Sequence, residues 1–149
     1  MATTVIPILA FTDDMLGQGF VHSLAKPGGN TTGVSILASE LDGKRQDLIM
    51  EAAPELRRMA ALADRVTSTA ARLQALQNAA HAHGVELVVH RIDRPEEIAP
   101  AIDAAKASDA GALNVLASAM LFNNRTIILD RVAALLRSQA FARPFSEFA

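Results

Sequence analysis

The sequence lacks the residue types that most often carry redox and stacking chemistry. Its 149 residues include no cysteine, tryptophan or tyrosine, so six phenylalanines supply all of the aromatic surface. Without cysteine there is neither a disulfide framework nor a thiolate metal site. This absence leaves the redox compartment open, because it suits both the cytoplasm and the periplasm.

A strong charge of one sign and a long hydrophobic run are also missing. The formal net charge is −2, and the basic residues are scattered or paired, as at Lys44-Arg45 and Arg57-Arg58. We therefore expect no nucleic-acid partner. No apolar run approaches the roughly 20 residues that a membrane-spanning helix needs. The opening MATTVIPILAF has no basic segment and does not resemble a signal peptide.

The residues that are present predict a globular α/β protein. Half of them are hydrophobic and a fifth are charged, as in ordinary soluble domains. The strand-like segments are 5–11, 33–37, 59–63, 85–92, 112–117 and 140–145. Helical periodicity covers 17–26, a segment from Ser39 to near Pro54, about 68–83, a segment opened by Pro95, and about 124–138. Such alternation predicts a mostly parallel sheet with helices on both faces, a three-layer αβα arrangement.

Local signals give the predicted helices their ends and their buried faces. Ser39 and Asp42 resemble a capping box, and Gly84 is placed to end its helix in the left-handed conformation. The predicted core stripes are Leu41, Leu48, Ile49 and Ala52 in the second helix, Leu73, Leu76 and Ala80 in the third, and Ile98, Ile102 and Ala105 in the fourth.

Motifs for catalysis fail at the residues that the chemistry requires. The stretch 28–34 has the glycine spacing of a phosphate-binding loop, but Val34 stands where the lysine must be. Gly17 and Gly19 follow a strand as in a dinucleotide-binding turn, but His22 occupies the third glycine position. No nucleophile–base pattern, metal-ligand cluster or cofactor motif is found, so the sequence favours binding over catalysis.

Two adjacent carboxylates follow the first predicted strand. Asp13 and Asp14 come at the carboxyl end of that strand, and ligands of open α/β sheets bind at this edge. A structural role in the loop or at a helix start is the alternative. Both interpretations stay open on the sequence alone.

Several segments together resemble one protein family. They are LAKPGGNTTG followed by ELDGKRQDLI, then HAHGVELVVHRIDRPEEI and ALNVLASAMLFNNRTII. In this combination the chain resembles the substrate-binding proteins of ABC importers with the type I periplasmic-binding fold, some of which take aromatic amino acids. The resemblance implies a Rossmann-like (flavodoxin-like) lobe and a chain that is a partial copy of its relatives.

The resemblance also implies a division into two lobes. Residues 1–33 correspond to the remnant of a first lobe, and residues 34–149 to a second lobe that is incomplete at its C-terminus. The crossover lies at 27–33, where Gly33 lets the chain pass closely into the next strand. The hinge residues implied by this assignment are Gly28, Gly29, Asn30 and Gly33.

In this family the ligand lies between the lobes and is contacted by loops at the carboxyl ends of strands. The ligand-binding residues implied for this chain are Thr12, Asp13, Asp14, Asp64, Ser118 and Phe122. Asp14 is placed to meet a ligand ammonium, and Phe11 and Phe122 to form apolar walls. Asp64 and Ser118 stand in loops that carry other polar residues in the family, Ser118 replacing an aspartate.

The function implied by the resemblance is capture of a small molecule for an ABC permease outside the cytoplasmic membrane, in the periplasm or anchored to the membrane. The resemblance implies no enzyme, cofactor or nucleic acid. We expect this chain to bind ligand weakly or not at all, and to form a homodimer through uncovered first-lobe or sheet-edge surface. Two alternatives are a ligand-sensing domain of a transcription regulator, which shares the fold, and a small α/β enzyme.

Overall fold

A computed structural model describes residues 6–17 and 19–142, and the chain divides into two compact units, Met1–Leu41 and Asp42–Ala149. The elements of the first unit are β1 (Ile8–Thr12), β2 (Thr31–Ser35) and a short 3-10 helix, η1 (Ala38–Glu40). The elements that follow are α1 (Leu41–Ala52), β3 (Arg58–Asp64), α2 (Ala70–Ala82), β4 (Glu86–Ile92), η2 (Pro95–Glu97), α3 (Ile98–Ala107), β5 (Ala112–Val115), α4 (Ala119–Asn123) and α5 (Arg125–Ala142).

The first unit is built on two parallel strands. β1 and β2 pair from Ile8 opposite Thr31 to Thr12 opposite Ser35. In this register Gly33 faces Ala10, and a Cβ at Gly33 would overlap the Ala10 carbonyl oxygen. Glycine is therefore required there by the close approach of the two backbones.

The helix predicted over 17–26 is wrong for the part of this segment that the structure describes, which forms turns and bends. The Asp14 carboxylate accepts hydrogen bonds from the N–H groups of Leu16 and Gly17 at 3.1 and 2.8 Å. Gly19 then adopts a φ of 73°. An aspartate-stabilised turn followed by a left-handed residue diverts the backbone from helical geometry, so the apolar spacing of the segment is overridden.

The first compact unit extends further along the chain than the predicted first lobe. Residues 31–33, placed by the sequence in the crossover, lie in β2 and pair with β1. Gly28 has a φ of 77° in the loop before that strand. The chain passes from one compact unit to the other after Leu41. The lobe assignment and the hinge role of the glycines and Asn30 stay predictions.

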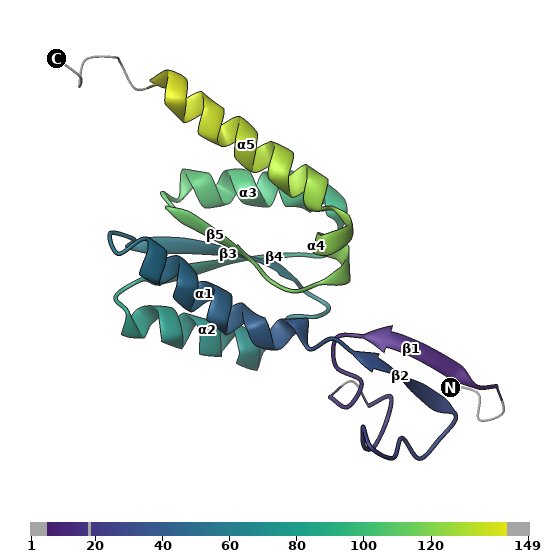
Figure 1. Cartoon of the computed structure of the whole chain (residues 1–149). Coiled ribbons are helices and arrows are strands. Elements are labelled where there is room, and N and C mark those ends of the chain that lie inside the picture. The colour runs from purple at the N-terminus through teal and green to yellow at the C-terminus, as the bar shows by residue number, and fades with distance from the viewer. Residues whose placement is uncertain (1–5, 18, 143–149) are drawn as a thin grey trace. The chain divides into compact units, whose positions relative to one another are not determined.

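The second unit has three layers. Its sheet has the strand order β4-β3-β5, and both pairs are parallel. Helices α1 and α2 cover one face of this sheet, and α3 and α5 cover the other (Figure 1). The predicted α/β fold with a mostly parallel sheet and helices on both faces is confirmed.

The central strand β3 is buried on both faces, because a layer of helices covers each. Met59, Ala61 and Ala63 pack in the cluster with α2, while Leu62 packs with residues of α3 and α5. The predicted stripes of the third and fourth helices are buried as well. Gly84 has a φ of 71° at the end of α2, which confirms its predicted role.

The predicted core stripe of α1 is wrong at two positions. Leu41 and Leu48 are exposed, and the residues that α1 buries are Asp42, Gln46 and Met50. Spacings of four residues place these three on one face of the helix. Two polar residues on a buried face are missed by a search for apolar periodicity, although polar groups are buried readily when they are paired.

The chain is helical at its described C-terminal end. α5 continues to Ala142, so the extended segment predicted over 140–145 is wrong for 140–142, and 143–145 lie outside the described residues. β5 stops at Val115, two residues earlier than predicted. This early end leaves residues 116–118 as a loop between β5 and α4.

Candidate functional site

Two predicted site residues meet at the carboxyl edge of the three-stranded sheet. Asp64 ends β3, and Ser118 lies just beyond the end of the neighbouring strand β5. The Ser118 hydroxyl donates to Oδ2 of Asp64 at 2.5 Å. Parallel neighbouring strands end at the same edge, which explains how residues 54 positions apart come into contact.

Backbone groups hold both side chains in place. The N–H of Val66 donates to Asp64 Oδ1 at 2.9 Å, and the N–H of Ser68 donates to the Asp64 carbonyl oxygen at 2.9 Å. The Ser118 hydroxyl accepts from Met120 N–H at 3.1 Å, so Ser118 is also the N-cap of α4. Both residues are thus fixed by turns that follow their strands.

Asp64 is a buried carboxylate without a cationic neighbour. Its exposed fraction is 6%, and within the described part of the chain no Lys, Arg or His nitrogen lies within 4.0 Å of its carboxylate. The adjacent Arg65 pairs instead with Asp93, at 2.8 Å between Nε and Oδ2. Burying an anion without a counter-charge is unfavourable in a structure built only for stability.

A second buried aspartate lies near this edge and was misassigned from the sequence. Asp42 does not form the predicted capping box, because its carboxylate is paired with both Arg45 and Arg72. It also accepts the N–H of Ala117, at 3.1 Å to Oδ1. Its exposed fraction is 1%. The signal for it in the sequence is the four-residue spacing that places Asp42 on the same face of α1 as Gln46.

Phe122 lies away from the core, on α4. Its side chain is 68% exposed, and the Arg125 guanidinium lies 5.0 Å from the centre of its ring. This distance is within the range of a cation–π interaction. Exposure leaves the ring accessible, and its role as an apolar wall stays a prediction.

The predicted residues of the first unit make hydrogen bonds within that unit. Asp14 shapes the turn described above, and Asp13 Oδ1 accepts the N–H of Ser39 at 3.1 Å. The Thr12 carbonyl oxygen accepts the N–H of Ile36 at 3.0 Å. These contacts support the structural alternative for the two aspartates without testing ligand contact, which stays a prediction for Thr12, Asp13 and Asp14.

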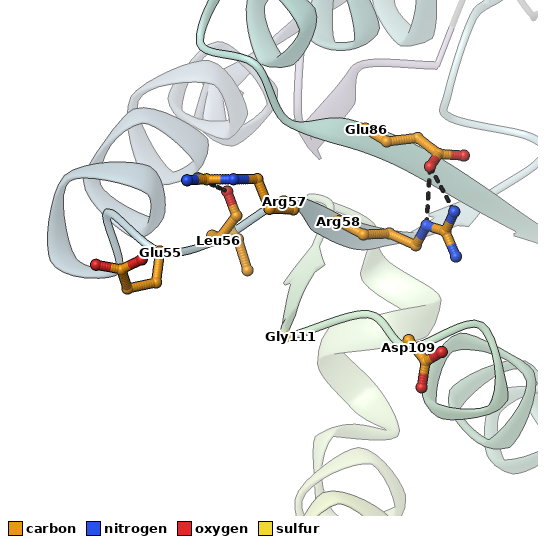
Figure 2. A pocket seen from close by; sticks show the side chains of 7 residues that line it. All are labelled: Glu55, Leu56, Arg57, Arg58, Glu86, Asp109 and Gly111. Carbon is orange, nitrogen blue, oxygen red and sulfur yellow. Dashed lines mark hydrogen bonds and ion pairs between the residues drawn. The ribbon is translucent and has the colours of Figure 1, made fainter.

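One cavity lies at the opposite, amino edge of the second unit's sheet. It has a volume of about 450 Å³ and is lined by charged residues at the starts of β3 and β4 (Figure 2). Arg58 there donates to Glu86 at 2.8 Å and to the Ser108 carbonyl oxygen at 2.7 Å. Arg57 donates to the carbonyl oxygens of Pro54 and Leu56, each at 3.2 Å. The arginines are therefore already engaged within the protein.

A second cavity is apolar and lies beside β5, between α3 and α5. Its volume is about 280 Å³, and Leu113, Val132 and Leu135 are among its lining residues. None of the six predicted ligand-binding residues lines either of these two cavities in the part of the chain that the structure describes. The candidate site is therefore a polar region at the carboxyl edge of the sheet, apart from both of these cavities.

The third strand of the sheet also ends at an acidic group. The N–H of Asp93, just after β4, donates to Glu97 Oε2 at 2.8 Å. This hydrogen bond, together with the neighbouring Arg94, lowers the pKa of Glu97 below its ordinary value.

The described residues hold no group of three or more His, Cys, Asp or Glu side chains suited to a metal ion. Over the same residues, no helix is long and apolar enough to cross a membrane.

Comparison with known proteins identifies a family and a fold. A family model described as ABC transporter substrate binding protein matches residues 1–135. No curated protein matches the chain. Among solved structures, an ABC domain in complex with L-Trp from Streptococcus pneumonia superposes with a TM-score of 0.68 at 22% identity, over 87% of this chain and 43% of that one.

A conserved domain protein from Vibrio cholerae also superposes, with a TM-score of 0.59 at 24% identity, over 75% of this chain and 37% of that one. At these identities the two likenesses show the fold alone. The chain spans less than half of the length of either structure.

Proposed function

Because the chain belongs to the ABC transporter substrate-binding protein family, we propose that it acts as a solute-binding component of an ABC-type import system. The proposed ligand is a small molecule that carries an ammonium group, such as an amino acid. The proposed role is recognition, not catalysis. This proposal agrees with the failure of the catalytic motifs in the sequence and with the polar sheet edge in the second unit.

The observation that carries the proposal is that the Asp64 carboxylate is buried without a positively charged neighbour. Its carboxylate is buried and fixed by Val66 N–H and the Ser118 hydroxyl, yet the described part of the chain offers it no cationic partner. A ligand ammonium would supply the missing positive charge. Charge-assisted hydrogen bonds of this kind are about twice as strong as neutral ones.

The same site favours an amino acid as the ligand. An amino acid needs an anion for its ammonium and hydrogen-bond donors for its carboxylate. Asp64 fits the first requirement. The L-Trp complex of the Streptococcus pneumonia neighbour makes L-tryptophan a reasonable probe, and the exposed ring of Phe122 is a candidate apolar contact for it.

The remaining parts of the proposal follow the family resemblance. Thr12, Asp13 and Asp14 would contribute ligand contacts from the first lobe, and the glycines at 28, 29 and 33 with Asn30 would form the hinge. Ligand binding would favour a closed state that a permease recognises, which is a shift of populations. We place this activity outside the cytoplasmic membrane.

The experiment that tests the proposal compares ligands that differ in one charged group. Amide chemical shifts of the 149-residue chain are followed by NMR during titration with L-tryptophan, tryptamine, which lacks the carboxylate, and indole-3-propionate, which lacks the ammonium. We expect L-tryptophan and tryptamine to shift the resonances of Val66 and Ser118. Equal shifts with indole-3-propionate, or none with either amine, would refute recognition of an ammonium at Asp64.

The proposed homodimer is tested separately by light scattering. A single mass near 15.8 kDa, the mass of one chain, at all concentrations would refute it. Such a result would leave the ligand proposal intact, because the contacts of Asp64 lie within one chain.

A further inference from the structure

We propose that Asp42 is a positioning residue for the candidate site, which it serves by holding the β5–α4 loop in place. The loop spans residues 116–118 and carries Ser118, the partner of Asp64. Asp42 contacts the loop through Ala117 N–H. The final step of the inference, an effect on ligand binding, rests on the proposed function, whereas the effect on the loop does not.

The β5–α4 loop is attached at two consecutive residues to two different elements. Ala117 N–H donates to the Asp42 carboxylate in the first turn of α1. The Ser118 hydroxyl donates to Asp64 at the end of β3. Since one peptide unit joins the two attachments, movement of Ala117 would displace the Ser118 hydroxyl from Asp64.

Residues of other elements and of the next turn of α1 also contact Asp42. Arg72 reaches its carboxylate from α2, and Arg45 reaches it from the next turn of α1. Asn114 in β5, itself only 1% exposed, donates from Nδ2 to the Asp42 carbonyl oxygen at 3.4 Å. The residue thus joins α1, α2 and the end of β5, and the second compact unit begins with it.

An ionised carboxylate is the group that suits all of these contacts. Its two oxygens accept several charge-assisted hydrogen bonds at once. An asparagine keeps the shape of the side chain but replaces one acceptor oxygen with a donor and removes the negative charge. We therefore use Asp42→Asn as the test variant and Arg72→Gln as the matched control. The control removes the ion pair with Asp42 and the hydrogen bond from Arg72 to the Thr67 carbonyl oxygen, but it leaves the acceptor of Ala117 N–H in place.

The first measurement is amide hydrogen exchange at two adjacent residues of the full chain. Leu116 N–H donates to the Leu62 carbonyl oxygen at 3.0 Å and serves as the internal reference for Ala117. In Asp42→Asn we expect exchange at Ala117 to accelerate at least about tenfold more than at Leu116, as loss of a charge-assisted hydrogen bond implies. In Arg72→Gln we expect the two amides to change together.

The positioning role is overturned if Asp42→Asn changes the two amides equally, or if Arg72→Gln accelerates Ala117 as selectively as Asp42→Asn does. A measurement on the unmutated chain keeps the test decisive if the variants fail to fold. We expect a scalar coupling across the hydrogen bond between the Ala117 nitrogen and the Asp42 carboxyl carbon. Its absence, where the coupling between Leu116 and Leu62 is detected, would also overturn the inference.

The binding step is tested with L-tryptophan as the probe. We expect Asp42→Asn to weaken L-tryptophan binding at least about tenfold, whereas Arg72→Gln changes it by less than about threefold. Unchanged affinity in Asp42→Asn would overturn the positioning role in binding. If the unmutated chain does not bind L-tryptophan or tryptamine, the proposed function fails, and exchange at Ala117 still decides whether Asp42 holds the loop.

Discussion

Two aspartates of the second unit are buried to a similar degree but are compensated in opposite ways. Asp42, at the start of α1, is 1% exposed and is paired with two arginines. Asp64, at the end of β3, is 6% exposed and is held only by hydrogen-bond donors without charge. Both contact the β5–α4 loop, at Ala117 and Ser118.

Under the proposed function, this difference assigns Asp42 to the structure and Asp64 to ligand recognition. A buried charge with internal counter-charges is neutralised within the protein, and removing it is costly because the ion pairs are lost. A buried charge without them remains able to bind an external cation. We therefore expect substitution of Asp42 to affect stability, the loop and, through the loop, ligand binding. Substitution of Asp64 should affect ligand recognition directly, with a smaller effect on stability.

The largest effect on stability is expected from Asp42→Ala. The change removes the ion pairs of Asp42 with Arg72 and Arg45 and the acceptor of Ala117 N–H, so the free energy of unfolding should fall by about 3–5 kcal/mol. Urea unfolding followed by circular dichroism measures it. The matched control is Asp103→Ala, which breaks the half-exposed pair with Arg131 and should cost less than about 1 kcal/mol. Equal losses of unfolding free energy in the two variants would show that the ion pairs of Asp42 contribute no more than an exposed ion pair.

A smaller effect on stability, with a larger effect on binding, is expected from Asp64→Asn. No cation is left unpaired, and the amide can keep one hydrogen bond to Val66 and one to Ser118, so the free energy of unfolding should change by less than about 1.5 kcal/mol. The preference for L-tryptophan over indole-3-propionate should disappear in NMR titration. Retained preference would show that another group binds the ammonium.

Ser118→Ala should cost about 1 kcal/mol of unfolding free energy, because it removes the N-cap of α4 and one of the donors to Asp64. Ser118→Thr keeps the hydroxyl and is the control, with an unfolding midpoint close to that of the unmutated chain. If threonine destabilises as much as alanine, the hydroxyl is not the group that matters.

The smallest effect is expected at Glu97, which lies just beyond the end of β4. Its pKa is lowered in the folded state, chiefly by the hydrogen bond from Asp93 N–H. The unfolded chain therefore binds more protons, and the contribution of Glu97 to stability is lost as the pH falls through the lowered pKa. Urea midpoints measured between about pH 6 and pH 3 should fall less steeply for Glu97→Gln. If the urea midpoints of the unmutated chain and of Glu97→Gln fall in parallel with pH, the lowered pKa of Glu97 does not contribute to stability.

Much of the second unit could be predicted from the sequence because its elements follow regular patterns. The apolar run of β3 requires helices on both faces, and the stripes of α2 and α3 follow helical periodicity. Gly84 ends α2 where a left-handed residue is needed. These features depend on local residue types, which the sequence displays directly.

The contacts of the site depend on residues far apart in the chain and could be predicted only in part. The resemblance placed both Asp64 and Ser118 in ligand-contacting loops, but their hydrogen bond requires the parallel pairing of β3 with β5. The spacing of Ser39 and Asp42 resembles a capping box, whereas the contacts of Asp42 with Arg72 on another helix and with Ala117 depend on the fold. The turn formed by Asp14 similarly overrides an apolar spacing that resembles a helix.

The contrast between the two aspartates is tested most directly by carboxyl-carbon NMR of both residues during one titration with L-tryptophan. If Asp64 receives the ligand ammonium, its carboxyl resonance shifts as binding saturates, while that of Asp42 changes little. A shift at Asp42 with none at Asp64, or saturation with neither resonance moving, would contradict the assignment of ligand recognition to Asp64.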